Sequence, residues 1–500
     1  MTTESGPVLV PLEHTYADEL AGFGAPWQPA EVPSPALVQL NAGLATELGL
    51  DAESLRSADA VRIFAGAAAP AGAHPIAQVY AGHQFGNFNP QLGDGRAVLL
   101  GEIVAPDGQR YDLSLKGSGR TPFSRGGDGK AALGPVLREY LMGEAMHALG
   151  VPTTRALAVA TTGDLVRRDG MLPGAVLTRV AASHIRVGTF QFFAARGDTE
   201  RLRQLVDYTI ARHDPELAAA DNPPLALLDV VIGRQASLIA RWMHLGFIHG
   251  VMNTDNVTIS GETIDYGPCA FMDAYEPATV FSSIDHAGRY AYGNQPTIGL
   301  WNMARLAEPL LPLIDPDQDR AVELATRALD TYQARYDAAW LTGMRTKLGI
   351  GIGIGIGAAD AGDAVDRQLA DDWLQLLHRH RVDYTTAFRR LTDAADGELA
   401  TRVGVTALFD DDISGWLDRW NARLAPDAAT TMRTANPIYV PRNHLVEGAL
   451  EAAVSDDDLA PFEQLLARVS DPYTPRPDSD EYELPAPDGF TRGYRTFCGT

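Results

Sequence analysis

The chain has 500 residues, 45% of them hydrophobic, which is enough to bury the core of one large domain or of two or three smaller ones. Its 41 basic and 64 acidic residues give a formal charge of -23, which argues against nonspecific binding to nucleic acid or to anionic membranes. No uninterrupted apolar run approaches the roughly 18 to 20 residues that span a bilayer. No basic residue precedes Arg56, so no secretory signal or transit peptide is visible and we expect a cytoplasmic protein.

The N-terminal part is expected to combine an irregular extension with a β-rich lobe. Residues 1–70 are rich in Pro and Ala and predict an extension with one short helix near 35–48. Residues 78–95 are rich in Gly, Asn and Gln and predict an ordered loop over a site. Two strands follow, 97–103 and 111–116, separated by a Pro-Asp-Gly turn that is typical of a hairpin.

A second polar loop over 117–129 leads into a helix over 131–149, whose apolar residues recur at helical spacing. Strands near 154–161 and 175–180 complete the β-rich lobe over 71–190. The remaining chain reads as mainly helical, with helices predicted over 200–212, 226–245, 320–341, 363–391, 413–424 and 446–468.

We therefore predict an α+β fold with the bilobal layout of a protein kinase, having a β-rich N-lobe and a mainly helical C-lobe. The C-lobe is assigned to 191–435. A C-terminal helical extension and a cysteine-bearing tail occupy 436–500.

The segment Phe247-Ile-His-Gly-Val-Met-Asn-Thr-Asp-Asn256 carries the clearest chemical signal. Residues 257–260 and 263–264 predict the strands of a short hairpin that brings Asp265 beside Asn256. An amide oxygen and a carboxylate would then share one hard cation, as the catalytic-loop Asn and the D-F-G Asp of kinase-shaped enzymes share magnesium. Here that triplet is Asp265-Tyr266-Gly267.

The usual kinase base is missing from this segment. When His249 is aligned with the histidine of H-R-D-L-x-x-x-N, Asn256 falls in register and Val251 occupies the position of the catalytic Asp. Asp255 is the remaining carboxylate that can act as a base. Its alternative role is that of an Asx-turn residue that caps the loop.

Lys116, at the end of a predicted strand, is the candidate phosphate-binding lysine. The only lysines are Lys116, Lys130 and Lys347, and such a bias toward arginine suggests positions that need a compact ammonium, although chance also explains a single survivor. Glu139 on the following helix is the favoured partner of Lys116, with Glu144 as the alternative.

Arginines and glycine loops are the remaining candidates for the nucleotide site. Arg179 and Arg186 flank the end of a predicted strand and, together with Lys116, would make the positive pocket that a triphosphate needs. Either arginine alone reads as a surface residue. The two polar loops offer backbone N–H groups to phosphates or to the base, although most glycine loops are only turns, and a P-loop motif is absent from the sequence.

The two cysteines, Cys269 and Cys498, are too few for a disulfide framework or a zinc site. Two unrelated thiols are one interpretation. The other is a redox latch between the tail and the active site, because Cys269 closely follows Asp265 and Cys498 is the third residue from the end.

Several long motifs in order resemble the selenoprotein O family (SelO, the YdiU group). They run from Tyr80-Ala-Gly-His-Gln-Phe-Gly86 through Asp112-Leu-Ser-Leu-Lys-Gly-Ser-Gly-Arg-Thr-Pro-Phe-Ser-Arg125 and residues 250–267 to Asn436-Pro-Ile-Tyr-Val-Pro-Arg-Asn443 and the cysteine near the end. The resemblance implies a kinase-like fold without the usual base, ATP bound in an orientation flipped relative to kinases, and transfer of AMP to hydroxyl side chains of proteins with release of pyrophosphate.

The resemblance also assigns roles residue by residue. It implies that Lys116, held by Glu139, and the two arginines grip the distal phosphates, that Asn256 and Asp265 hold magnesium near the α-phosphate, and that Asp255 takes the proton from the acceptor hydroxyl. It implies that Cys498 stands where many members carry selenocysteine and can be linked to Cys269. The residues that it assigns to the lining of the nucleotide pocket are Gly93, Gly95, Arg96, Asp128 and Gly129.

Three rival functions remain open from the sequence. One is a true protein kinase, and another is a nucleotide-binding pseudoenzyme scaffold, which the valine at the base position motivates. The third is transfer of UMP from UTP with manganese.

Overall fold

The computed structural model describes residues 10–168, 170–351, 359–397, 399–409 and 412–497. Its centre is an eight-stranded sheet in the order β1-β3-β6-β7-β10-β9-β2, with β8 paired to β10 and every pairing antiparallel. The strands are β1 (Gly24–Pro26), β2 (Ala36–Leu40), β3 (Ile76–Gln78), β6 (Ala97–Val104), β7 (Arg110–Lys116), β8 (Ala131–Ala132), β9 (Arg155–Arg167) and β10 (Met171–Ala181).

Both faces of this sheet are covered, so its central strands β6, β7 and β10 are buried along most of their length. Leu99 and Leu177 pack with Leu137 and Leu141 of α4 (Leu133–Ala148) in the larger core. Alternate residues of the same strands pack on the other face with α2 (Ala42–Glu47) and α3 (Ala58–Phe64). The predicted strands and the helix after them are therefore confirmed, because local pattern and tertiary burial agree there.

The expected irregular N-terminal extension is only partly right. Strands β1 and β2 form the two edges of the sheet, and the predicted helix over 35–48 is a strand followed by the shorter helix α2. Asn41 separates the two because its side chain accepts the Leu44 N–H at 3.0 Å and caps α2. Pairing with β9 overrides the helical pattern of residues 36–40.

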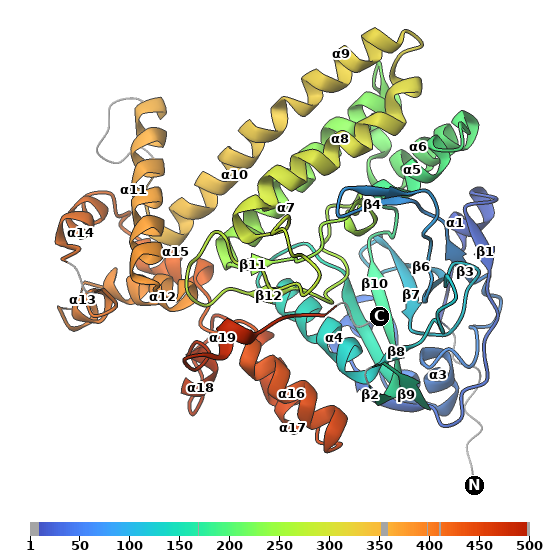
Figure 1. Cartoon of the computed structure of the whole chain (residues 1–500), viewed down its shortest axis with the longest axis horizontal. Helices are drawn as coiled ribbons and strands as arrows, with labels where there is room; N and C mark the ends of the chain where they lie inside the picture. Colours follow the sequence, from blue (N-terminus) through green and yellow to red (C-terminus); the bar gives the residue numbers. More distant parts are fainter. Residues whose placement is uncertain (1–9, 169, 352–358, 398, 410–411, 498–500) are drawn as a thin grey trace.

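Helices make up most of the remaining chain, and Figure 1 shows the long helices α7, α8 and α10 extending away from the sheet. Short helices outside this part are α1 (Thr15–Glu19) and the 3-10 turn η1 (Ser54–Arg56). The helices of this part are α5 (Val187–Ala194), α6 (Thr199–His213), α7 (Pro223–Leu245), α8 (Gln295–Ile314), α9 (Gln318–Leu329), α10 (Thr331–Leu348), α11 (Ala359–His380), α12 (Tyr384–Ala394), α13 (Leu399–Thr406), α14 (Ser414–Asn421), α15 (Ala428–Ala435), α16 (Asn443–Ser455), α17 (Ala460–Val469), α18 (Asp480–Glu483) and α19 (Phe490–Gly493).

Three predicted helices are each two helices. Breaks fall between α9 and α10, between α11 and α12, and between α16 and α17. Arg381 and Asp457, in the second and third breaks, have φ of 52° and 55°, a left-handed conformation that ends a helix. One described helix, α7, is long and apolar enough to cross a membrane, yet 56% of its apolar window is buried within the molecule, as in the core helix of a globular domain.

The hairpin predicted over 257–264 is wrong. Thr258 bridges to Arg186 and Thr263 bridges to Thr153, so the two short segments pair with neighbouring parts of the fold and not with each other. The turn between them is closed by the Thr258 side chain, whose Oγ1 accepts the Glu262 N–H at 3.0 Å and donates to the Glu262 carbonyl at 2.7 Å. The backbone groups of Thr258 and Thr263 therefore form their hydrogen bonds with other segments, and the predicted hairpin ladder does not form.

Candidate active site

A cavity of about 460 Å³ opens between the end of the sheet, the polar loop before β8 and the catalytic loop, which we define as residues 249–256. Within that loop η3 (Thr254–Asn256) is a single 3-10 turn. The cavity gathers residues that are far apart in the sequence. The predicted site residues in its lining are Gly93, Gly95, Arg96, Lys116, Asp128, Gly129, Glu139, Asp255, Asn256 and Asp265.

Four charged side chains form one buried cluster at this cavity. Lys116 Nζ lies 2.5 Å from Glu139 Oε2 and also contacts Asp265. Arg179 donates from Nε to Glu139 Oε1 at 2.9 Å and from Nη2 to Asp265 Oδ1 at 2.6 Å. Glu144, the alternative partner, binds Arg155 instead.

The sheet and α4 explain why these charges meet. Lys116 on β7 lies opposite Leu177 of β10, so Lys116 and Arg179 are diagonal neighbours on one face of the sheet. Helix α4 packs on that face and delivers Glu139 between them. A buried ion cluster of this kind needs every charge compensated, and here two cations face two carboxylates.

Asp265 is held in a strained and strongly charged setting. Burial favours its neutral form, but Lys116, Arg179 and Arg186 outweigh burial and hold the pKa of Asp265 well below its usual range. Its φ is 66°, a left-handed conformation that costs a non-glycine residue about 1 to 3 kcal/mol. A carboxylate that its neighbours keep ionised is suited to binding a cation or to fixing the lysine.

Asp255 has the surroundings of a proton acceptor. Burial raises its pKa to about 6. Its Oδ2 accepts a hydrogen bond from Gln84 Nε2 at 3.4 Å, whereas its Oδ1 is buried and has no hydrogen-bond partner among the described residues. Because Asp255 also lines the cavity, its carboxylate is a candidate acceptor for a ligand's proton.

Asn256 presents an amide oxygen to the same cavity. Its Nδ2 donates to the Val251 carbonyl at 3.1 Å, which leaves Oδ1 as the side chain's acceptor. No group of three or more His, Cys, Asp or Glu able to hold a metal occurs in the part of the chain that the structure describes. Asn256 and Asp265 fit magnesium nevertheless, because that ion is usually held by one or two protein oxygens plus water and substrate phosphates.

Neither predicted arginine lines the cavity. Arg179 is only 2% exposed and its guanidinium is engaged by the two carboxylates. Arg186 lies behind the wall, where its guanidinium stacks on the Tyr80 ring at 4.5 Å and donates to the Asp255 carbonyl at 3.3 Å. In this structure Arg179 supports Asp265 and Arg186 supports Asp255, and their grip on the distal phosphates stays a prediction.

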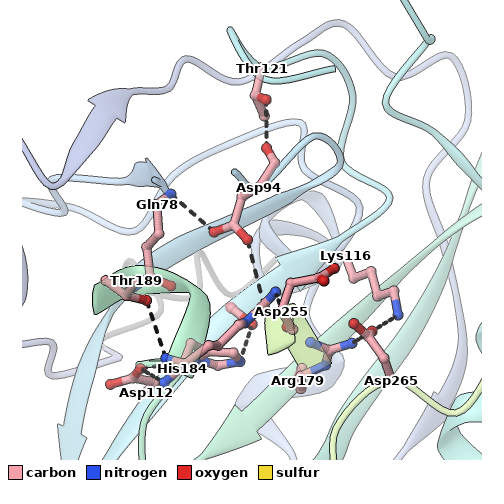
Figure 2. A network of polar contacts seen from close by, with 12 residues as sticks. Gln78, Asp94, Asp112, Lys116, Thr121, Arg179, His184, Thr189, Asp255 and Asp265 are labelled. Carbon is pink, nitrogen blue, oxygen red and sulfur yellow. Dashed lines mark hydrogen bonds and ion pairs between the residues drawn. The ribbon is translucent and has the colours of Figure 1, made fainter. Parts of the chain in front are cut away.

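Asp94 completes the layer behind the wall and was missed in the sequence. Figure 2 shows Asp94 bonded to the Gln78 backbone N–H, and its carbonyl oxygen reached by Thr121. Its Oδ1 lies 3.7 Å from Arg186 Nη2. The adjacent Gly93 and Gly95, which sequence reasoning did select, were the available signal for this position.

The hairpin of β4 (Gly82–Gln84) and β5 (Asn87–Asn89) lies against the catalytic loop. The His83 N–H donates to Thr254 Oγ1 at 2.7 Å and the Phe85 N–H donates to Asn253 Oδ1 at 2.9 Å. The predicted loop over a site is therefore present, and it contains this hairpin. Gln84 and Asn253 had escaped notice because their roles depend on contacts about 170 residues apart.

The polar loop has its own internal bonds. Asp128 accepts from Arg168 at 3.0 and 3.2 Å and from the Lys130 N–H at 3.0 Å, so it shapes the loop. Gly129 has φ of 68° and lies against the Gly119 backbone, where a side chain would not fit.

Cys269 is buried beside the cluster, and its thiol donates to the Tyr266 carbonyl at 3.2 Å. Burial raises its pKa to about 12. Cys498 lies outside the described residues, so the disulfide stays a prediction. The nearby Thr496 does reach this region, because its hydroxyl donates to the Pro268 carbonyl at 2.6 Å.

The cavity thus brings together a lysine, two candidate oxygen ligands and glycine-lined walls. Comparison with known proteins places the enzyme among the nucleotidyltransferases. A family model described as "Protein adenylyltransferase SelO" matches residues 9–470. The chain belongs to the SelO family.

Similar proteins cover nearly the whole chain. A "Protein nucleotidyltransferase YdiU" of Cereibacter sphaeroides is 61% identical over 491 residues, 98% of this chain and 99% of its own. Proteins of the same name from Chromobacterium violaceum and Rhizobium etli are 57% and 56% identical, covering 95% and 98% of this chain and 99% and 97% of their own.

Proposed function

We propose that this protein is a magnesium-dependent protein adenylyltransferase that transfers AMP from ATP to serine, threonine or tyrosine hydroxyls, within a bilobal kinase-like fold. The observation that carries the proposal is the pairing of an intact Lys116–Glu139 contact with Val251 at the kinase base position. The family description supports AMP as the transferred group. The relatives' names support a nucleotidyl group without specifying which one.

A flipped ATP fits AMP transfer, the reaction that the family description supports. The distal phosphates would lie by Lys116, which is the cavity-lining cation of the buried cluster. The α-phosphate would lie by Asn256 and Asp265, the candidate metal ligands. Magnesium, when bound, would neutralise charge on the phosphate oxygens during in-line attack.

Asp255 would act as the base. Its carboxylate, with a pKa of about 6, is mostly ionised at neutral pH and accepts the proton of the acceptor hydroxyl. The hydroxyl oxygen forms a bond to the α-phosphorus, the bond from that phosphorus to the bridging oxygen breaks, and pyrophosphate leaves. Gln84 donates to the Asp255 carboxylate and Arg186 donates to the Asp255 carbonyl. These two hydrogen bonds would keep the proposed base oriented toward the acceptor hydroxyl.

The test uses ATP labelled either at the α- or at the γ-phosphate, with magnesium and a cell extract as acceptor. Label from the α position on protein, with released pyrophosphate, supports the proposal. Label from the γ position instead would establish a kinase, and no label with intact ATP binding would favour a scaffold. UTP with manganese, run in parallel, decides between AMP and UMP as the transferred group.

Asp255→Asn tests the base. The variant keeps the shape of the side chain and removes the proton acceptor, so we expect the transfer rate to fall about 10²-fold or more while ATP affinity is retained. An unchanged rate would return Asp255 to the role of a turn residue.

We also propose that oxidation joins Cys269 to Cys498 and restricts access of acceptors. The position of Thr496 beside Pro268 supports this, since Cys498 follows two residues later. A mobility shift on nonreducing gels that Cys498→Ser abolishes is the expected result. Two alkylatable thiols under oxidant would disprove the latch.

A further inference from the structure

A second cavity, of about 830 Å³, shares a wall with the nucleotide cavity. It is lined by residues between 277 and 294 together with Arg495. Ile284 lines the nucleotide cavity, while the adjacent Ser283 and Asp285 line the second one. Ile284 is also half-exposed, so a side chain of a bound molecule can pass from one cavity to the other over this residue.

The wall is fixed to the catalytic loop. Asp285 accepts hydrogen bonds from the backbone N–H groups of Arg289 and Tyr290 at 2.9 and 2.8 Å. The Tyr290 hydroxyl then donates to Asn253 Oδ1 at 2.7 Å. Asn253 precedes Asp255 by two residues, so the second cavity has a defined position relative to the proposed base.

The lining has the chemistry of a peptide site. Small residues such as Ala278, Ala287 and Gly293 leave room for the side chains of a bound chain. The ionisable groups of the lining are Asp285, which is bonded within the turn, His286 and Arg495. A polyphosphate would need more clustered cations than this, whereas an uncharged backbone does not.

Residues 281–283 already pair with an extended chain here. The Thr496 N–H donates to the Phe281 carbonyl and the Ser283 N–H donates to the Thr496 carbonyl, both at 2.9 Å. Successive residues of an extended strand turn their backbone groups to opposite sides. The backbone groups of Arg495 therefore face away from Ser283 and are not used by this pairing, while Arg495 itself lines the cavity.

We infer that this second cavity is the acceptor groove, which binds an extended polypeptide as a strand along Arg495 and directs its hydroxyl side chain over Ile284 toward Asp255. The inference rests on the proposed transfer to protein hydroxyls. Hydrogen bonds to the backbone of the acceptor would give affinity for many sequences. The small lining residues would accept acceptor side chains of different sizes.

The first experiment fills the groove. Ala287 is exposed, so Ala287→Trp adds bulk without disturbing the core, and Ala218→Trp adds the same bulk at an exposed position outside both cavities. The acceptor is a heat-denatured protein extract, a mixture of extended chains, with α-labelled ATP and magnesium. We expect Ala287→Trp to lower labelling about tenfold or more, with ATP affinity by calorimetry within about twofold of the wild type, and Ala218→Trp to label normally.

The outcomes separate the two proposals. If the wild type labels no protein, the proposed function fails and the groove with it. If the wild type labels the extract and Ala287→Trp does so equally, only the groove is refuted. Wild-type label confined to folded acceptors, or an equal loss of ATP affinity in Ala287→Trp, would also overturn the inference.

The second experiment tests the strand. Arg495→Pro removes the backbone N–H as well as the guanidinium, whereas Arg495→Ala removes the guanidinium alone. Tyr494 has φ of -68° and ψ of 127°, which a following proline tolerates. We expect about a tenfold fall in labelling for the proline variant and a fall of about threefold or less for the alanine variant. Equal effects would contradict binding through the backbone.

Discussion

Gly82 lies directly against the carboxylate of Asp255, so that a Cβ added at residue 82 would come within 2.7 Å of Asp255 Oδ1. The same atom would approach Leu92 Cδ1 at 3.0 Å. The glycine therefore lets the β4–β5 hairpin close on the catalytic loop. The carboxylate is also bonded to Gln84 of this hairpin, so the hairpin contacts the proposed base at two positions.

Gly82→Ala should displace the Asp255 carboxylate. A misplacement of about 1 Å at a reacting group costs on the order of 10²-fold in rate, and we expect a loss of that size in α-label transfer. Thermal unfolding should change much less, since the displaced group lies in a cavity wall. Gly415→Ala is the control, because a Cβ there meets nothing within 4 Å. Equal activities of the two variants would show that the contact is irrelevant.

Glu139→Gln should affect both stability and function. The change removes one of two carboxylates that compensate Lys116 and Arg179, and breaking a buried pair in this way costs about 3 kcal/mol or more in the free energy of unfolding. Denaturant unfolding measures that cost, and ATP affinity should fall as Lys116 loses its orientation.

Glu144→Gln is the matched control for this change. Glu144 lies on the same helix and binds Arg155 through both oxygens, away from the nucleotide cavity. We expect this variant to lose stability without losing ATP affinity. A similar loss of affinity in both variants would argue that helix stability alone explains the first result.

Asn256→Ala should raise the magnesium concentration needed for half-maximal transfer by about tenfold, because one of two protein oxygen ligands is lost. Asn256→Asp keeps an oxygen there and should need less magnesium than the alanine variant. The measurement is a magnesium titration of the initial rate. Identical titration curves for the wild type and the alanine variant would remove Asn256 from the metal site.

Lys347 should make stability depend on pH. It is buried against the rings of Phe388 and Tyr384, at 4.2 and 5.6 Å, and burial lowers its pKa to about 7. Since the unfolded chain holds this proton up to about pH 10.5, it binds more protons than the folded chain above pH 7, and stability rises with pH in that range.

We therefore expect the free energy of unfolding of the wild type to rise by about 1 to 3 kcal/mol from pH 7 to pH 9 relative to Lys347→Met. Urea unfolding at both pH values measures this difference. Lys130→Met, at a lysine with 39% of its side chain exposed, serves as the control. Parallel pH curves for all three proteins would show that Lys347 does not titrate in this range.

Much of the site followed from local sequence pattern. The hairpin that ends at Lys116 and the helix that carries Glu139 are adjacent in the chain, so strand alternation and helical periodicity sufficed to place the pair. Asn256 and Asp265 do line one cavity, although the hairpin predicted to join them does not form. The sequence spacing of Asn256 and Asp265 thus predicted their proximity correctly, whereas the hairpin geometry assumed for it was wrong.

The rest depended on contacts between distant segments. Strand pattern cannot say that β1 and β2 close the sheet edges, because edge pairing is decided by the partner strand. Likewise an arginine's sequence position does not say whether it faces a cavity or stacks behind its wall, as Arg186 does on Tyr80.

The residue types thus set the chemistry available to this protein, namely an ammonium at a strand end, an Asn and an Asp with hard oxygen donors, and a valine at the kinase base position. Tertiary packing alone decided which groups touch. It turned Arg179 and Arg186 toward the aspartates, closed the β4–β5 hairpin on Asp255 and opened the acceptor groove beside Ile284. The physical reason is that burial and hydrogen-bond satisfaction are settled between segments many residues apart, where no local pattern reaches.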